Sequence, residues 1–215
     1  MRRSLLIAAV AAAMLLTTAS LATAGTIAIS AISGGTAATA GGDQLYGWIF
    51  STSAAVTVTA LGVYDMGDPG LSISHDVGIY RQSDQSLVGS ATVPAGVSGF
   101  LDSGFRFTNL GTSIGLSADT YVIVMTMPAY NADSQLIDVS SFNTASPITW
   151  INSALGSSSA LAFPDPSGNG NFAPGLFGPN FIFEEQSVPE PASALLLVAG
   201  FVGLLVRRRF TRRAL

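Results

Sequence analysis

The clearest structural signal in this sequence is the stretch AVTVTALGVY, which runs from Ala55 to Tyr64. Val56 and Val58 alternate with threonines, and the apolar series continues to Val63. Side chains two residues apart in a strand point to the same face, so alternation of this kind with β-branched residues is typical of a half-buried strand. The stretch therefore predicts a β-strand, and the segments on either side can be compared with it.

The neighbouring segments repeat this pattern and extend it along most of the chain. The segment from Tyr121 to Met127 is apolar at almost every position, which predicts a strand at the centre of a sheet, buried on both faces. Beyond Pro128 the pattern becomes weaker and the candidate strands become shorter. The expected strands are Thr26–Ile32, Gln44–Phe50, Ala55–Tyr64, Ser74–Tyr80, Leu87–Val93, Gly99–Phe107, Tyr121–Met127, Leu136–Val139, Ile148–Ile151, Leu161–Phe163 and Phe181–Phe183.

Turn-forming residues separate these strands. Gly, Pro, Asp and Asn concentrate at Asp65–Gly70 and Asp165–Gly175, and the pairs Gly34-Gly35 and Gly41-Gly42 predict a loose loop between them. No segment between the two ends of the chain has a sustained helical period. Short strands with regularly recurring turns indicate an all-β fold, and we expect an antiparallel β-sandwich of the jelly-roll kind.

The beginning of the chain has the features of a secretory signal peptide. Two arginines precede an apolar core from Leu5 to Leu16, and Ala22 and Ala24 supply small residues at a cleavage site. This order of features predicts a signal peptide over residues 1–24, which signal peptidase would remove to leave Gly25 as the first residue. An uncleaved N-terminal anchor is the alternative.

The end of the chain, residues 188–215, combines three features in order. Pro189-Glu190-Pro191 comes first, and the two prolines resist helix formation. The uncharged run Ala192–Val206 follows; as a helix it would span about 22 Å, short of a hydrocarbon core of about 30 Å. Arginines near the C-terminus would hold that end of the chain in the cytoplasm, so the run would form a single transmembrane helix with a fixed orientation. These arginines are Arg207, Arg208, Arg209, Arg212 and Arg213.

The combination of these three features resembles the PEP-CTERM sorting signal. The resemblance implies that the tail is a substrate of exosortase, a membrane enzyme, with processing near Pro189, Glu190 and Pro191. It also implies a transient stay in the inner membrane of a Gram-negative envelope, followed by delivery to the cell surface or the medium. A plain C-terminal anchor is the alternative that the residues alone leave open.

The segment between the two ends, residues 25–187, is strongly acidic. It holds only two of the nine cationic residues, Arg81 and Arg106, and all but one of the 13 acidic residues. A basic surface is needed to neutralise phosphates, so this composition excludes nucleic acid as a partner. The chain has no cysteine, so its domain cannot be stabilised by disulfides and must rest on packing.

Part of this segment is similar to uncharacterised β-domains of PEP-CTERM proteins. The similarity lies in Gly47-Trp48-Ile49-Phe50, in Leu61-Gly62-Val63-Tyr64-Asp65 and in His75-Asp76-Val77-Gly78-Ile79-Tyr80. These domains have no assigned activity, so the resemblance supports the β fold and implies nothing about chemistry.

Residues for catalysis are scarce. His75 is the only histidine, and neighbouring Asp76 would point to the opposite face of a strand, so the two cannot act together directly. The chain lacks the zinc-binding helix motif and the phosphate loop. We therefore expect a protein without enzymatic activity, and a hydrolase remains a minor alternative.

Calcium and carbohydrate are the two ligands that the sequence leaves open. Asp165-Pro166-Ser167-Gly168-Asn169-Gly170 imitates the start of a calcium loop, but Leu176 stands where that loop needs a glutamate. Asp65 and Asp68 share one turn and could supply oxygen ligands. No resident metal or cofactor is expected from so weak a pattern. Trp150 and Tyr130, in the less regular part of the chain, are the aromatic residues most suited to stacking on sugar rings.

These observations predict an exported protein that acts outside the cell. By family resemblance it would be linked to exopolysaccharide and the extracellular matrix. A carbohydrate-binding module sorted in the same way is the second hypothesis.

Overall fold

The computed structural model describes residues 25–128, 133–164 and 175–186, and these residues form β-strands and no helix. The chain divides into two compact units, Met1–Glu185 and Gln186–Leu215, and every strand belongs to the first. The strands are β1 (Thr26–Ile27), β2 (Ile29–Ala38), β3 (Gln44–Thr52), β4 (Val56–Tyr64), β5 (His75–Arg81), β6 (Leu87–Val93), β7 (Phe100–Asp102), β8 (Phe105–Leu116), β9 (Asp119–Met127), β10 (Gln135–Thr144), β11 (Ile148–Gly156) and β12 (Pro179–Glu185).

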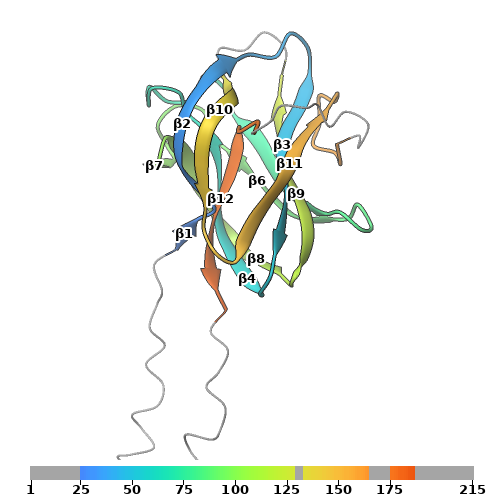
Figure 1. Ribbon diagram of the computed structural model, residues 1–215. Helices are drawn as coiled ribbons and strands as arrows, with labels where there is room; N and C mark the ends of the chain where they lie inside the picture. Colours follow the sequence, from blue (N-terminus) through green and yellow to red (C-terminus); the bar gives the residue numbers. More distant parts are fainter. Residues whose placement is uncertain (1–24, 129–132, 165–174, 187–215) are drawn as a thin grey trace, which may run out of the picture. The chain divides into compact units, whose positions relative to one another are not determined.

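The strands form three antiparallel sheets (Figure 1). Sheet A has the order β1-β12-β4-β8-β7, sheet C has the order β11-β3-β9-β5-β6, and the two-stranded sheet B pairs β10 with β2. Every pairing between named strands is antiparallel. The prediction of an all-β, antiparallel fold is therefore confirmed for the described residues.

Sheets A and C pack face to face over one shared core. Trp48 and Phe50 of β3 meet Phe181 of β12, with ring centroids 5.7 and 5.0 Å apart. The indole Nε1 of Trp48 also donates a hydrogen bond of 2.8 Å to the carbonyl oxygen of Pro179. Because aromatic rings bury large areas, these contacts supply much of the apolar burial that holds the two sheets together.

Strand β9 is the central strand of sheet C. Residues Tyr121–Met127 are all buried, as the sequence predicts for a central strand. Tyr121, Ile123 and Met125 belong to the shared core, whereas Val122 and Val124 face outward. The outward residues are covered by Leu161 and Phe163 from the segment after β11.

The domain begins and ends at the same place. Strand β1 pairs antiparallel with β12, with Thr26 opposite Phe183, so the chain enters sheet A beside the point where it leaves. We call this end of the domain, defined by Gly25 and Glu185, the terminal end; it lies at the bottom of Figure 1. The opposite end is called the distal end; strands β4, β6 and β9 finish there, at Tyr64, Val93 and Met127.

The structure corrects three sequence predictions. The loop predicted between Gly34-Gly35 and Gly41-Gly42 is shorter than expected, because β2 continues through the first pair to Ala38; both of these glycines have positive φ, and the pairing of β2 with β10 is irregular beside them. The segment Gly99–Phe107 is a hairpin and not one strand, because Ser103 and Gly104 turn the chain with positive φ. Leu161–Phe163 is not a strand and packs as irregular chain on sheet C.

The predicted signal peptide (1–24) and sorting tail (188–215) lie outside the described residues. Among the residues that are described, no helix has the length and apolarity needed to cross a bilayer.

Candidate functional site

The distal end is held by a buried ion pair. Arg106 of β8 donates from Nη2 and Nε to Asp65 Oδ2, at 2.6 and 3.0 Å. Asp65, which directly follows β4, also accepts hydrogen bonds from the backbone N–H of Gly70. The guanidinium further reaches the carbonyl oxygens of Gly99 and Asp68, so one side chain fixes two loops and a strand.

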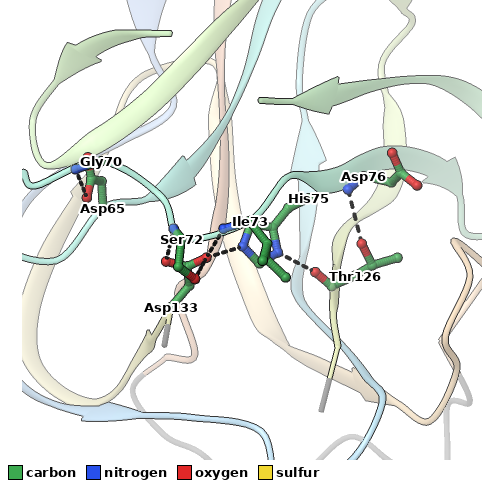
Figure 2. A network of polar contacts seen from close by, with 8 residues as sticks. All are labelled: Asp65, Gly70, Ser72, Ile73, His75, Asp76, Thr126 and Asp133. Carbon is green, nitrogen blue, oxygen red and sulfur yellow. Dashed lines mark hydrogen bonds and ion pairs between the residues drawn. The ribbon is translucent and has the colours of Figure 1, made fainter. Parts of the chain in front are cut away.

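A second buried carboxylate, Asp133, lies beside this pair and organises the chain between Leu71 and His75 (Figure 2). Its Oδ1 accepts from the N–H of Ser72 at 2.7 Å. Its Oδ2 accepts from the hydroxyl of Ser72 at 2.8 Å and from the N–H of Ile73 at 3.2 Å. His75 Nε2 lies 2.9 Å from the same oxygen. Asp133 thus ties the end of one loop to the start of β5.

His75 is fully buried, and both of its ring nitrogens face acceptors. Nδ1 lies 2.7 Å from the carbonyl oxygen of Thr126, which can only accept, so Nδ1 carries a proton. Burial opposes ionisation of Asp133, but hydrogen bonds from Ser72, His75 and Ile73 outweigh it and lower the pKa of this carboxyl. Nε2 lies against Asp133 Oδ2, so His75 and Asp133 form a buried side-chain contact.

A cavity of about 130 Å³ lies between the two carboxylates. Asp65 and Asp133 form part of its wall, together with Tyr64, Met66, Ser72 and Ser134. Arg106 compensates the charge of Asp65, and His75 contacts the carboxylate of Asp133, so the cavity is lined by hydrogen-bond acceptors that already have partners in the protein.

Comparison with known proteins identifies the C-terminal end of the chain. The model of the PEP-CTERM protein-sorting motif matches residues 187–209. The chain carries a PEP-CTERM sorting signal. This signal implies exosortase as the processing partner, export from the cell, and a cell-surface or extracellular destination. No curated protein and no solved structure gave a significant match.

The matched range includes the predicted processing residues Pro189, Glu190 and Pro191 and the first three arginines of the terminal cluster. Arg212 and Arg213 follow it. The predicted signal-peptidase residues Ala22 and Ala24 and the sugar-stacking candidate Tyr130 lie outside the described residues, and their roles stay predictions. The same holds for the loop at Asp165.

Trp150, the other sugar-stacking candidate, lies on β11 at the edge of sheet C and is half-buried. Its ring meets Phe142 edge-on, with centroids 5.6 Å apart, so part of the indole is taken up by packing. Its contact with carbohydrate stays a prediction, and Trp150 is not among the residues that line the distal cavity.

The remaining residues predicted from the sequence are His75 with Asp76 and Asp65 with Asp68. His75 is buried and Asp76 exposed, in agreement with their opposite directions along a strand. Asp65 and Asp68 share a turn, but the Asp65 carboxylate is directed to Arg106 and Gly70. Within the described ranges, no group of three or more His, Cys, Asp or Glu side chains is arranged to hold a metal ion.

Sequence reasoning missed the two residues on which the distal end depends, Arg106 and Asp133. Arg106 gave a usable signal, because it stands between Phe105 and Phe107 and is one of only two cations in the domain. A cation in so apolar a strand needs a buried anion as partner. Asp133 gave none, because it lies 58 residues from His75 in an irregular segment and only the tertiary fold brings them together.

Proposed function

We propose that this protein is a non-enzymatic component of the extracellular matrix, linked to exopolysaccharide and released to the surface by exosortase after transient insertion in the inner membrane. The observation that carries the proposal is the position of the chain ends in the β domain. Because β1 and β12 are antiparallel neighbours, the first described strand begins and the last one ends at the terminal end.

The geometry around the only histidine supports a role without catalysis. A hydrolytic triad needs a nucleophile within hydrogen-bond reach of the histidine. Here Ser72 donates to Asp133, and both ring nitrogens of His75 are occupied by Thr126 and Asp133. The ring is also fully buried, so it cannot reach a substrate. These residues are arranged to stabilise the fold.

We also infer that the domain is a jelly roll. Taken in chain order, β1, β3, β4, β5, β6, β8, β9 and β12 supply the orders β1-β12-β4-β8 in sheet A and β3-β9-β5-β6 in sheet C. This is the arrangement expected when a long hairpin of eight strands is folded over into two four-stranded sheets, with β7 and β11 added at the edges. Jelly rolls include lectin domains, which favours carbohydrate binding as the second candidate function.

The sorting part of the proposal is tested by expressing the full chain in a host with and without exosortase. With the enzyme, we expect shortened protein at the surface or in the medium, and without it full-length protein in the membrane fraction. If signal peptidase removes residues 1–24, the intact mass of the exported protein should be that of a chain whose first residue is Gly25. Full-length protein in the membranes of both hosts would support a plain C-terminal anchor instead.

The non-enzymatic and matrix parts need separate measurements. The exported protein should co-sediment with the exopolysaccharide of the producing cells, and a panel of chromogenic glycosides and esters should show no turnover above the buffer rate. Turnover of any of these substrates would contradict the absence of catalysis. Failure to co-sediment would remove the link to exopolysaccharide and leave the sorting result unaffected.

A further inference from the structure

We propose that the distal cavity between Asp65 and Asp133 is a binding site for one neutral, hydroxyl-rich six-membered ring, namely a pyranose unit. The inference rests on the proposed extracellular function, because an exported protein meets sugars there, but its test does not depend on sorting. Trp150, a sugar-stacking candidate from the sequence, is not among the residues that line this cavity, and Tyr130, the other candidate, lies outside the described residues.

The size of the cavity selects the ligand first. Its volume is about 130 Å³. A cavity of about 150 Å³ in a protein core can take up benzene, and a water molecule occupies about 30 Å³ in the liquid. The distal cavity therefore holds one six-membered ring or a few waters, but not a peptide or two sugar units.

The chemistry of the wall selects a ligand that donates hydrogen bonds. Asp65 and Asp133 offer carboxylate oxygens, and an ionised carboxylate can only accept. Asp65 Oδ1 accepts one hydrogen bond in the described part of the chain, from Gly70 at 3.2 Å, so it can accept another. The hydroxyl of Ser134, which is half-buried, makes no hydrogen bond among the described residues and can donate or accept. Adjacent hydroxyls of a sugar match such a set.

The charge balance of the wall argues against a metal ion or an amine. Each carboxylate already has a buried partner, the cationic Arg106 at 2.6 Å from Asp65 and the imidazole of His75 at 2.9 Å from Asp133. A cationic ligand would have to enter next to the positive charge of Arg106 and compete for carboxylate oxygens that already have partners. A neutral ligand meets no such repulsion and can use the strong, charge-assisted acceptors.

The position of the cavity and its apolar rim also suit a sugar ring. Tyr64 is held in place by edge-on contact with Phe105, at 5.5 Å between centroids, and Met66 at the rim is 52% exposed. Aromatic and apolar side chains cover the C–H faces of a sugar while polar groups bind its hydroxyls. The cavity lies at the distal end, opposite the end of the domain at which β12 finishes with Glu185.

The test uses the full chain in a detergent without a sugar head group. Saturation-transfer NMR would be recorded with methyl glucoside, methyl galactoside and methyl mannoside in both anomers, and with oligosaccharides of the sugar that binds. We expect at least one methyl pyranoside to bind. Binding of the free unit and its oligosaccharides alike would indicate recognition of a chain end, and binding of the free unit alone would indicate a monosaccharide ligand.

Two variants connect binding to this cavity. Ser134→Leu fills it and should weaken binding at least tenfold, and Ser134→Ala removes one hydroxyl and should weaken it about three- to tenfold, the usual effect of one hydrogen bond. Ser90→Leu, at an exposed position of β6, is the matched control and should bind like the wild type. If circular dichroism shows that Ser134→Leu fails to fold, Ser134→Ala still tests whether the sugar binds in this cavity.

Three results would overturn the proposal. One is the absence of binding for every methyl pyranoside up to solubility. The second is undiminished binding by folded Ser134→Leu and Ser134→Ala, which would place the sugar elsewhere. The third is binding of Ca²⁺ that Ser134→Leu abolishes while no pyranoside binds. None of these results would affect exosortase-dependent release, so failure here is distinct from failure of the proposed sorting.

Discussion

Arg106 and Asp65 form an ion pair in the interior of the domain, with Nη2 and Oδ2 2.6 Å apart and both residues at most 6% exposed. Removal of one partner of a buried pair leaves the other charge without compensation, which typically costs about 3–5 kcal/mol. We expect Arg106→Ala to lower the free energy of unfolding of the isolated domain, residues 25–187, by about this amount. Urea denaturation followed by tryptophan fluorescence measures it.

Arg81 is the matched control for this prediction, because it is the only other cation of the domain and its ion pairs with Asp84 and Asp119 are solvent-exposed. Exposed pairs contribute little to stability, so Arg81→Ala should have a much smaller effect than Arg106→Ala. Equal losses of unfolding free energy in the two variants would show that the buried ion pair contributes no more to stability than the exposed ones.

The pKa of Asp133 makes part of the stability depend on pH. Hydrogen bonds lower the folded pKa below the unfolded value of about 3.9, so the contribution is complete above that value and is lost as the pH falls through the folded pKa. Asp133→Asn should therefore lower the free energy of unfolding at pH 6 by about 1–3 kcal/mol, because buried donors lose a charged acceptor, and its difference from the wild type should shrink as the pH falls through the folded pKa. Asp102→Asn, at an exposed position of β7, is the control and should change the free energy of unfolding at pH 6 much less. A difference that stayed constant with pH would contradict this account.

Val124 tests the central position of β9. Its side chain is fully buried under the segment that contains Leu161 and Phe163. An isolated buried carboxylate costs several kcal/mol, which is comparable to the whole stability of a domain, so Val124→Asp should unfold it. Thr149→Asp, at an exposed position of β11, should leave the β-type circular dichroism spectrum of the soluble wild-type domain unchanged. A folded Val124→Asp domain would show that β9 is wrongly placed.

Gly47 is required by the close approach of β3 and β9. A Cβ atom at this position would lie 1.8 Å from the carbonyl oxygen of Ile123, which is backbone and cannot move aside. We expect Gly47→Ala to lower the melting temperature strongly, because overpacking of this kind costs about 1–3 kcal/mol or more. Gly115→Ala, where a Cβ meets nothing within 4 Å, should change it little. Similar melting temperatures for the two variants would contradict the observed strand spacing.

The sorting tail allows a prediction that separates insertion from release. Glu190 is the only charge between the two prolines of the motif, whereas the apolar run and the arginines govern insertion and orientation. Glu190→Ala should therefore insert normally and remain in the membrane in a host with exosortase. Replacement of the terminal arginines by glutamate should instead disturb orientation, which protease protection of spheroplasts would detect. Normal release of the Glu190→Ala variant would show that exosortase does not need the charge of Glu190.

The sequence predicts most strands because apolar alternation is a local property. The predicted segment Leu87–Val93 matches β6 at both ends, and Ala55–Tyr64 differs from β4 by one residue. The prediction was wrong where backbone geometry overrides composition, as at Gly34 and Gly35, whose positive φ angles are accommodated inside a strand. The distal site could not be predicted, because its two buried polar pairs, Arg106 with Asp65 and His75 with Asp133, join residues 41 and 58 positions apart. Such pairings depend on the order of the strands in the sheets, and the alternation of apolar residues along each strand does not reveal that order.

The pairing of β12 with both β1 and β4 has a mechanical consequence for a protein held by its C-terminal end. A pull on the tail acts along β12, inside sheet A, so the hydrogen bonds on both sides of the strand are loaded in shear and must break together. A pull perpendicular to an edge strand would break such bonds one after another and would need less force. Tension from flowing water or from an attached polymer thus enters the domain along the direction in which its sheet resists best.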